Sequence, residues 1–141
     1  MNWNFLKMSV MAVCTVLMLN ACEKEENNPS LPYDSVFGSW EWIQTTQGLT
    51  GVEILADSVD YDQALLIEKD DKYTWSKNDT VTQSLTFKVI QDTVNTSGDA
   101  EYYFQFTNDT LPNQSFYIVN QDTLHLSNDC ADCDSFIFVR K

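Results

Sequence analysis

Apolar and polar residues alternate along most of the chain from residue 33 to residue 141, and this period of two constrains the fold more than any other feature. Side chains of a β-strand point to opposite faces in turn, so the alternation predicts strands that bury one face. The same segments are rich in β-branched and aromatic residues, which favour strands. We expect eight strands, over residues 38–46, 63–69, 72–77, 80–91, 100–107, 115–119, 123–127 and 135–140.

Short polar segments such as Asp70-Asp71 and Asn78-Asp79 separate these strands, and short connections of this kind join antiparallel neighbours. An open meander would leave two unpaired edges, and closing the sheet on itself removes both. We therefore expect an all-β fold, an eight-stranded antiparallel up-and-down barrel, and a two-sheet β-sandwich is the alternative that spacing leaves open. Residues 48–61 form the longest irregular stretch, which suits a helical turn or an open lid.

Residues 1–21 have the layout of a secretory signal peptide, with Lys7 as the only charge and an apolar run over residues 8–19. That run is shorter than the roughly 20 residues of a transmembrane helix. The segment ends on Leu19-Asn20-Ala21-Cys22, which resembles the lipobox of bacterial lipoproteins. The resemblance implies cleavage before Cys22 and its acylation, which holds a protein on a membrane almost permanently. An ordinary signal peptide followed by an unrelated cysteine is the alternative.

Residues 22–33 are polar and contain two prolines, which is typical of a flexible tether ahead of a domain over residues 34–141. The run Glu23-Lys24-Glu25-Glu26 resembles the signal that sends lipoproteins to the outer face of the outer membrane in some Gram-negative bacteria. A solvated linker would have the same composition. We expect a lipid-anchored protein of the outer membrane of a Gram-negative bacterium, facing the periplasm or the cell surface.

Acidic residues outnumber basic residues strongly. The formal net charge is −13 for the whole chain, and removal of Lys7 with the signal peptide makes it −14. Nucleic acids and anionic lipid surfaces both need a basic footprint, so this charge argues against either as a partner of the folded domain. The membrane is expected to hold the protein through acyl chains alone.

Two short motifs lie at the ends of the expected barrel. Gly38-Ser39-Trp40 opens its first strand, and residues 136–141 close its last strand with Arg140. Over residues 38–141 this pattern resembles the lipocalin family, and in particular the lipocalin-like domains of small bacterial lipoproteins. The resemblance implies that Gly38 and Trp40 close one end of the barrel, with the Arg140 cation stacked on the indole. Such a contact is worth about 0.5–2 kcal/mol.

The side chains that alternation turns inward are largely aromatic, and a barrel of this size either packs solid or holds one small ligand. Its own rings could fill it, because each buries about 150–250 Å². Alternatively, some of them line a pocket whose polar tips orient a ligand. The candidate lining residues are Trp42, Tyr73, Trp75, Tyr102 and Phe104.

Cys130 and Cys133 are the only cysteines outside the signal peptide and the lipidation site, and in an oxidising compartment we expect them to form a disulfide. Free thiols, a redox pair or a metal site are the alternatives. A redox pair normally needs a helix N-terminus, and zinc needs more ligands than the single histidine, His125, supplies. His125 lies in an expected strand, turned away from the core. The nearby acidic residues at 129, 132 and 134 could hold calcium, but aspartate is also a common turn residue. We expect no metal, no cofactor and no catalytic set.

An Asp-Ser or Asp-Thr dipeptide occurs seven times, and in six cases an aliphatic residue follows. This pattern resembles the acceptor of a periplasmic O-glycosylation system of some Gram-negative bacteria. A structural explanation also exists, because aspartate closes turns and hydroxyl or β-branched residues open strands. The candidate glycosylation sites are Ser35, Ser58, Thr80, Thr93, Thr110 and Thr123.

These observations lead to an expected function. We expect a lipid-anchored, lipocalin-like module that is not an enzyme and that has a binding or envelope-accessory role, with a small apolar ligand as one candidate partner. The alternative is a protein–protein interaction subunit of the envelope, with a solid core and no small-molecule pocket.

Overall fold

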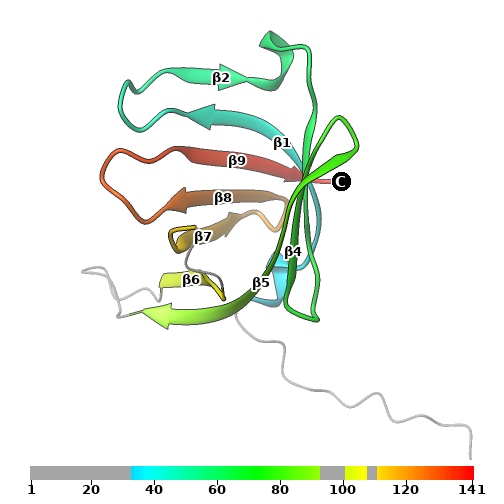
Figure 1. The fold of residues 1–141 in the computed structure, drawn as a ribbon, viewed down its shortest axis with the longest axis vertical. Coiled ribbons are helices and arrows are strands. Elements are labelled where there is room, and N and C mark those ends of the chain that lie inside the picture. The colour runs from blue at the N-terminus through cyan, green and yellow to red at the C-terminus, as the bar shows by residue number, and fades with distance from the viewer. Residues whose placement is uncertain (1–32, 93–100, 108–110) are drawn as a thin grey trace, which may run out of the picture. The chain divides into compact units, whose positions relative to one another are not determined.

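The computed structural model describes residues 33–92, 101–107 and 111–141, drawn in colour in Figure 1. The signal peptide, the lipidation site Cys22, nearly all of the tether, Thr93 and Thr110 lie outside the described residues. In the described part, no helix is long and apolar enough to span a membrane. The strands are β1 Gly38–Thr46, β2 Glu53–Leu55, β3 Gln63–Ile67, β4 Lys72–Lys77, β5 Thr80–Asp92, β6 Glu101–Phe106, β7 Gln114–Val119, β8 Thr123–Asn128 and β9 Ser135–Arg140.

The sheet closes on itself, because β1 pairs with β3, the strands from β3 to β9 pair antiparallel in chain order, and β9 pairs with β1 (Figure 1). Trp40 lies opposite Arg140 in the closing pair, and Thr46 lies opposite Ser135 at its other end. The expected antiparallel barrel is thereby confirmed, and the sandwich alternative does not apply. All eight expected strands are present, with ends within two residues of those expected.

The strand β2 was not expected from the sequence. It pairs with Gln44, Thr45 and Thr46, whereas β3 pairs with the first half of β1, so the two strands follow one another along the same edge of β1. A 3₁₀ turn, η2 (Ala56–Ser58), follows β2. The stretch over residues 48–61 thus holds the helical turn that the sequence suggests, together with a short strand.

The barrel interior is filled by aromatic rings over most of its length. Phe104 stacks on Phe116 with 4.3 Å between ring centroids, and it meets Phe87 edge-to-face at 4.9 Å. Tyr73 packs edge-to-face on Phe106 at 5.1 Å. Fully burying one such side chain stabilises a fold by about 1.5–3 kcal/mol. The inward positions of the period-two pattern therefore supply the core.

One end of the barrel is closed by Trp40 and by a second 3₁₀ turn, η1 (Asp34–Val36). Trp40 is fully buried, and its indole N–H donates to the Val36 carbonyl at 2.8 Å. The Arg140 guanidinium carbon lies 4.2 Å from the centroid of the Trp40 ring, which is the contact that the lipocalin resemblance implies. Gly38 has φ of +138°, and a Cβ there would lie 2.9 Å from Arg140 Nη1. The backbone conformation therefore favours glycine, and a Cβ there would also require the end of the flexible Arg140 side chain to shift.

Candidate functional site

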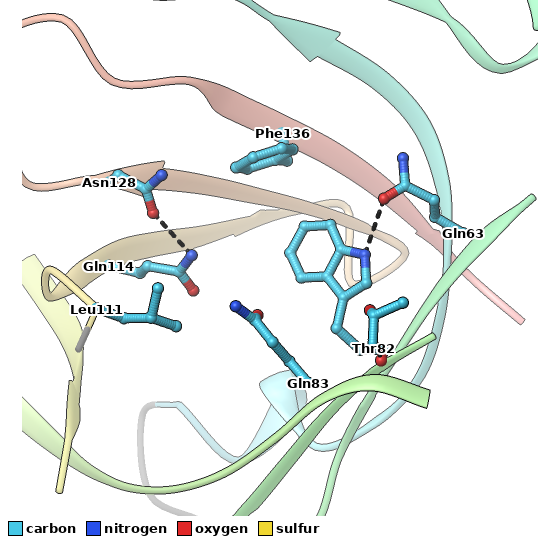
Figure 2. A pocket seen from close by; sticks show the side chains of 8 residues that line it. Gln63, Thr82, Gln83, Leu111, Gln114, Asn128 and Phe136 are labelled. Carbon is cyan, nitrogen blue, oxygen red and sulfur yellow. Dashed lines mark hydrogen bonds between the residues drawn. The ribbon is translucent and has the colours of Figure 1, made fainter. Parts of the chain in front are cut away.

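The opposite end of the barrel holds a cavity of about 370 Å³ that opens to solvent, and we call it the mouth. Its walls come from the ends of strands β3, β4, β5, β7, β8 and β9, because these ends converge there (Figure 2). The lining residues are Gln63, Trp75, Thr82, Gln83, Leu111, Gln114, Asn128 and Phe136.

Four of these residues are carboxamides at inward-facing positions of their strands. Gln63 is in phase with the buried Leu65 on β3, and Gln114 is in phase with the buried Phe116 on β7. Gln83 on β5 and Asn128 on β8 occupy corresponding positions at the ends of their strands. The alternation that builds the aromatic core therefore continues to the mouth, but with amides in place of rings.

The apolar wall of the mouth is built around Trp75. Its ring meets Phe136 edge-to-face at 5.0 Å and Phe138 at 5.2 Å between centroids. Phe138 is fully buried, whereas Trp75 and Phe136 are partly exposed toward the cavity that they line. Rigid aromatic side chains of this kind offer a large apolar surface to a ligand at little entropic cost.

The Trp75 indole fixes the orientation of Gln63. The indole N–H donates to Gln63 Oε1 at 2.9 Å, and since an indole nitrogen can only donate, the carbonyl of Gln63 must face it. The amide nitrogen of Gln63 makes no hydrogen bond within the described residues and remains a donor at the mouth.

A second hydrogen-bonded series runs from the core to the mouth. The hydroxyl of Tyr73 donates to Gln114 Oε1 at 3.0 Å, and Gln114 Nε2 donates to Asn128 Oδ1 at 2.8 Å. Burial raises the pKa of Tyr73 well above its ordinary value, and the hydrogen bond to Gln114 opposes this only partly, so the phenol stays protonated as a donor. The series ends on the amide nitrogen of Asn128.

Gln83 is the carboxamide with unused hydrogen-bonding capacity at both ends. Its side chain makes no hydrogen bond in the described part of the chain, and Figure 2 shows it pointing into the space in front of Gln114. The neighbouring Thr82 hydroxyl donates to the Trp75 carbonyl at 3.1 Å. The mouth thus combines an aromatic wall with unpaired amide groups, and none of its eight lining residues is charged.

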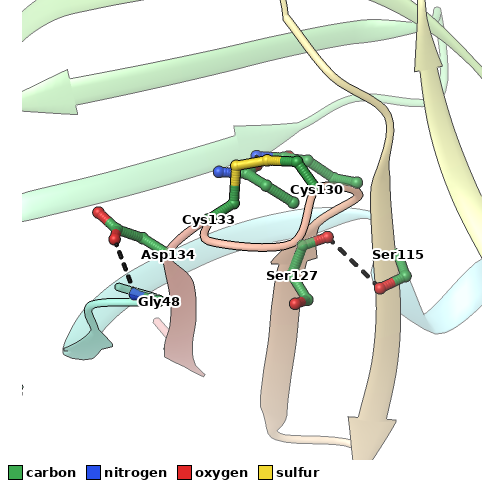
Figure 3. Close-up of a disulfide and its surroundings, with 8 residues drawn as sticks. Gly48, Ser115, Ser127, Cys130, Cys133 and Asp134 are labelled. Carbon is green, nitrogen blue, oxygen red and sulfur yellow. Dashed lines mark hydrogen bonds between the residues drawn. A yellow bond between two sulfur atoms is a disulfide. The ribbon is translucent and has the colours of Figure 1, made fainter. Parts of the chain in front are cut away.

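The loop between β8 and β9 carries the expected disulfide, which is confirmed: Cys130 and Cys133 are bonded (Figure 3). The loop runs from Asn128, which lines the mouth, to Ser135, the residue before the lining residue Phe136. Asp134 at its end accepts a hydrogen bond from the Gly48 backbone N–H at 3.2 Å.

That loop packs closely on the segment between β1 and β2. A Cβ atom at Gly48 would overlap the Cys133 carbonyl, so only glycine fits there. Within the described residues, no three acidic, histidine or cysteine side chains form a group that could hold a metal ion. The acidic residues Asp129, Asp132 and Asp134 therefore do not converge as calcium ligands.

Of the five candidate ligand-lining residues, only Trp75 lines the mouth. Trp42, Tyr73 and Phe104 are at most 2 % exposed and belong to the core, because their rings pack against other rings inside the barrel. Tyr102 lies at the start of β6 and stacks on Phe116 at 6.1 Å, away from the mouth. The expectation that aromatic residues form the site is replaced by a largely carboxamide site with one of those aromatics.

His125 faces outward, as its position between Leu124 and Leu126 predicts. It stacks on Tyr117, which is 60 % exposed, with 4.4 Å between ring centroids. Partial burial lowers the pKa of His125. A groove of about 260 Å³ on the outer wall, over β7, β8 and β9, is lined by both rings.

Four candidate glycosylation sites fall in the described residues. Ser35, Ser58 and Thr80 are exposed, and Thr123 is partly exposed. The Ser58 hydroxyl donates to the Leu55 carbonyl at 2.7 Å, and the Thr123 hydroxyl donates to Asp122 Oδ1 at 2.9 Å. These local bonds fit the structural explanation of the dipeptide, in which the hydroxyl caps a turn. Glycosylation stays a prediction.

The comparisons with known proteins add no family: no protein-family model, no curated protein and no solved structure matches this chain.

Proposed function

We propose that this protein is a lipid-anchored lipoprotein of the outer membrane whose lipocalin-like domain binds a small uncharged molecule at the barrel mouth. The observation that carries the proposal is the cavity of about 370 Å³, with its aromatic wall and with amide groups of Gln63, Gln83 and Asn128 that have no partner among the described residues. Small-molecule sites generally have volumes of about 300–1,000 Å³ and combine apolar walls with a few placed polar groups.

The lining of the mouth supports binding rather than catalysis. Its described residues include no carboxylate, imidazole, amine or thiol, and the one hydroxyl among them, that of Thr82, already donates to a backbone carbonyl. General acid–base and nucleophilic catalysis need a titratable or activated group beside the reacting atoms. We therefore propose a module that is not an enzyme.

The lipobox resemblance and the tether composition support the anchoring part of the proposal. Acyl chains on Cys22 would hold the protein on the membrane, and a flexible tether would let the barrel bind its ligand in the aqueous phase. The acidic charge of the chain supports an anchor through lipid alone, since it opposes attraction of the domain to anionic headgroups.

Native mass spectrometry of the protein purified from its own membranes tests both parts. We expect a polypeptide that begins at residue 22 and carries acyl chains, together with a non-covalently retained small molecule. Gln83→Trp fills the mouth and should remove the retained molecule. Gln105→Trp places the same ring on the exposed face of β6 and should keep it. Retention in both variants, or a mature chain without lipid, would contradict the corresponding part.

A second candidate function is a protein–protein interaction subunit of the envelope. The outer wall favours it, because Tyr117 and Val119 are exposed apolar side chains two residues apart on β7. Exposed apolar patches often mark interaction sites. Tyr117→Ser should then weaken a complex isolated from the native membrane without changing ligand binding at the mouth, whereas an unchanged complex would exclude this face.

A further inference from the structure

We propose that the ligand of the mouth is a saccharide: an uncharged ring that carries several hydroxyl groups. This inference rests on the proposed function, because it specifies the ligand class of the same site. Three features of the mouth support it: the charge of its lining, its unused hydrogen-bonding groups and its aromatic wall.

The charge of the lining selects a neutral ligand. A charged ligand that leaves water needs an opposite charge or several hydrogen bonds to replace its hydration. The eight lining residues offer no charged group, although the chain as a whole carries a formal charge of −13. Among the described lining residues, an anion would meet no cation, and a cation would meet no carboxylate.

The hydrogen-bonding groups select a ligand with many hydroxyls. Gln63 and Asn128 each present amide N–H donors that are unpaired among the described residues, while Gln83 presents both donors and an acceptor. A hydroxyl both donates and accepts, so several hydroxyls on one ring can satisfy all three amides. A purely apolar ligand would instead strip water from these amides and leave them unpaired, which is unfavourable.

The aromatic wall selects a ligand with one apolar face. Trp75 and Phe136 present ring surface to the same cavity that the amides surround. A sugar ring has C–H groups on its faces and hydroxyls at its edge, which matches a wall of rings bordered by amides. The volume of about 370 Å³ lies at the lower end of the range of about 300–1,000 Å³ for small-molecule sites, which is ample for one sugar ring.

Saturation-transfer NMR on the full-length protein, held in a polyoxyethylene detergent that lacks sugar headgroups, tests this inference. The probes are glucose, galactose, mannose and N-acetylglucosamine, with glucuronic acid as a charged sugar and cyclohexanol as an apolar ring of hexose size. Protein-free micelles provide the background. We expect at least one neutral sugar to bind with a dissociation constant of about 1 mM or below, and the charged and apolar probes to bind more weakly.

Gln83→Leu should weaken sugar binding by about tenfold, because it removes hydrogen bonds to the ligand. Gln83 makes no hydrogen bond within the described residues, so the substitution removes no such contact inside the protein, and Gln83→Ala gives a second variant. Gln105→Leu on the exposed face of β6 is the matched control and should leave binding unchanged. Sugar binding that Gln83→Leu does not weaken would overturn the inference.

The outcomes distinguish a failure of the saccharide inference from a failure of the proposed binding function. If cyclohexanol binds more tightly than every neutral sugar and Gln83→Leu strengthens it, the saccharide inference fails while the binding function stands. If no probe binds and no retained molecule is found in the native protein, the proposed function fails as well.

Discussion

Replacing Arg140 with alanine should destabilise the barrel more than the loss of any other exposed cation. Arg140 is the only arginine of the chain. Its Nε donates to the Gln121 carbonyl at 3.0 Å, its Nη1 to the Phe37 carbonyl at 3.2 Å, and its Nη2 to the Ser35 carbonyl. One side chain thereby joins η1, the start of β1 and the turn between β7 and β8 at the closed end.

The magnitude follows from these contacts. The stacking on Trp40 is worth about 0.5–2 kcal/mol. Each of the three hydrogen bonds adds about 0.5 kcal/mol, at the low end of the usual range because the side chain is exposed and water replaces it in part. The sum is about 2–3.5 kcal/mol, which is a large share of the roughly 5–15 kcal/mol that stabilises a domain. For a domain of this size the melting temperature should fall by roughly 10 °C.

Urea unfolding followed by tryptophan fluorescence measures the effect. Lys88→Ala is the matched control, since it removes the same charge from an exposed strand position. Arg140→Lys should lie between the wild type and Arg140→Ala, because an ammonium keeps the charge over the ring but cannot reach all three carbonyls. If Arg140→Ala unfolds at the same urea concentration as Lys88→Ala, the closed end does not depend on this residue.

Three further predictions concern the core, the loop and the outer wall. Tyr73→Phe leaves the Gln114 carbonyl without its donor and should lower the free energy of unfolding by about 1–3 kcal/mol. Adding Gln114→Leu to the same chain should restore much of this loss. If the losses of the two substitutions simply add, the two side chains are not coupled. Replacing Cys130 and Cys133 with serine should cost about 2 kcal/mol in the same assay, since the closed loop is short, and unchanged stability would refute it. NMR titration of His125, the only histidine, should give a pKa below 6.5. The unfolded chain then binds a proton more readily than the folded one, so the free energy of unfolding should decrease as the pH falls from 6.5 to the pKa of the folded state. A pKa above 6.5 would show that stacking on a ring outweighs burial.

The strands of the barrel could be predicted because each repeats one physical signal several times. Trp40 and Trp42 are buried while Glu41 between them is exposed, and Leu124 and Leu126 flank the outward His125 in the same way. The strand β2 escapes this reasoning because it has three residues, of which only Ile54 is partly buried. A period of two cannot be recognised in so short a segment, and the pairing with β1 is what makes it a strand.

The mouth could not be located from the sequence, because a polar residue at the end of a strand normally indicates exposure to solvent. Gln63, Gln83, Gln114 and Asn128 lie on four different strands, and each taken alone looks like the solvated start or end of a strand. The signal that identifies them is their phase: each occupies an inward position, two residues from a buried or partly buried apolar side chain. A soluble barrel with a packed core needs no polar group at such positions, and an inward carboxamide loses water unless a partner replaces it. Four of them in phase around one aromatic wall are therefore the physical basis for the proposed binding of a polar ligand at the mouth.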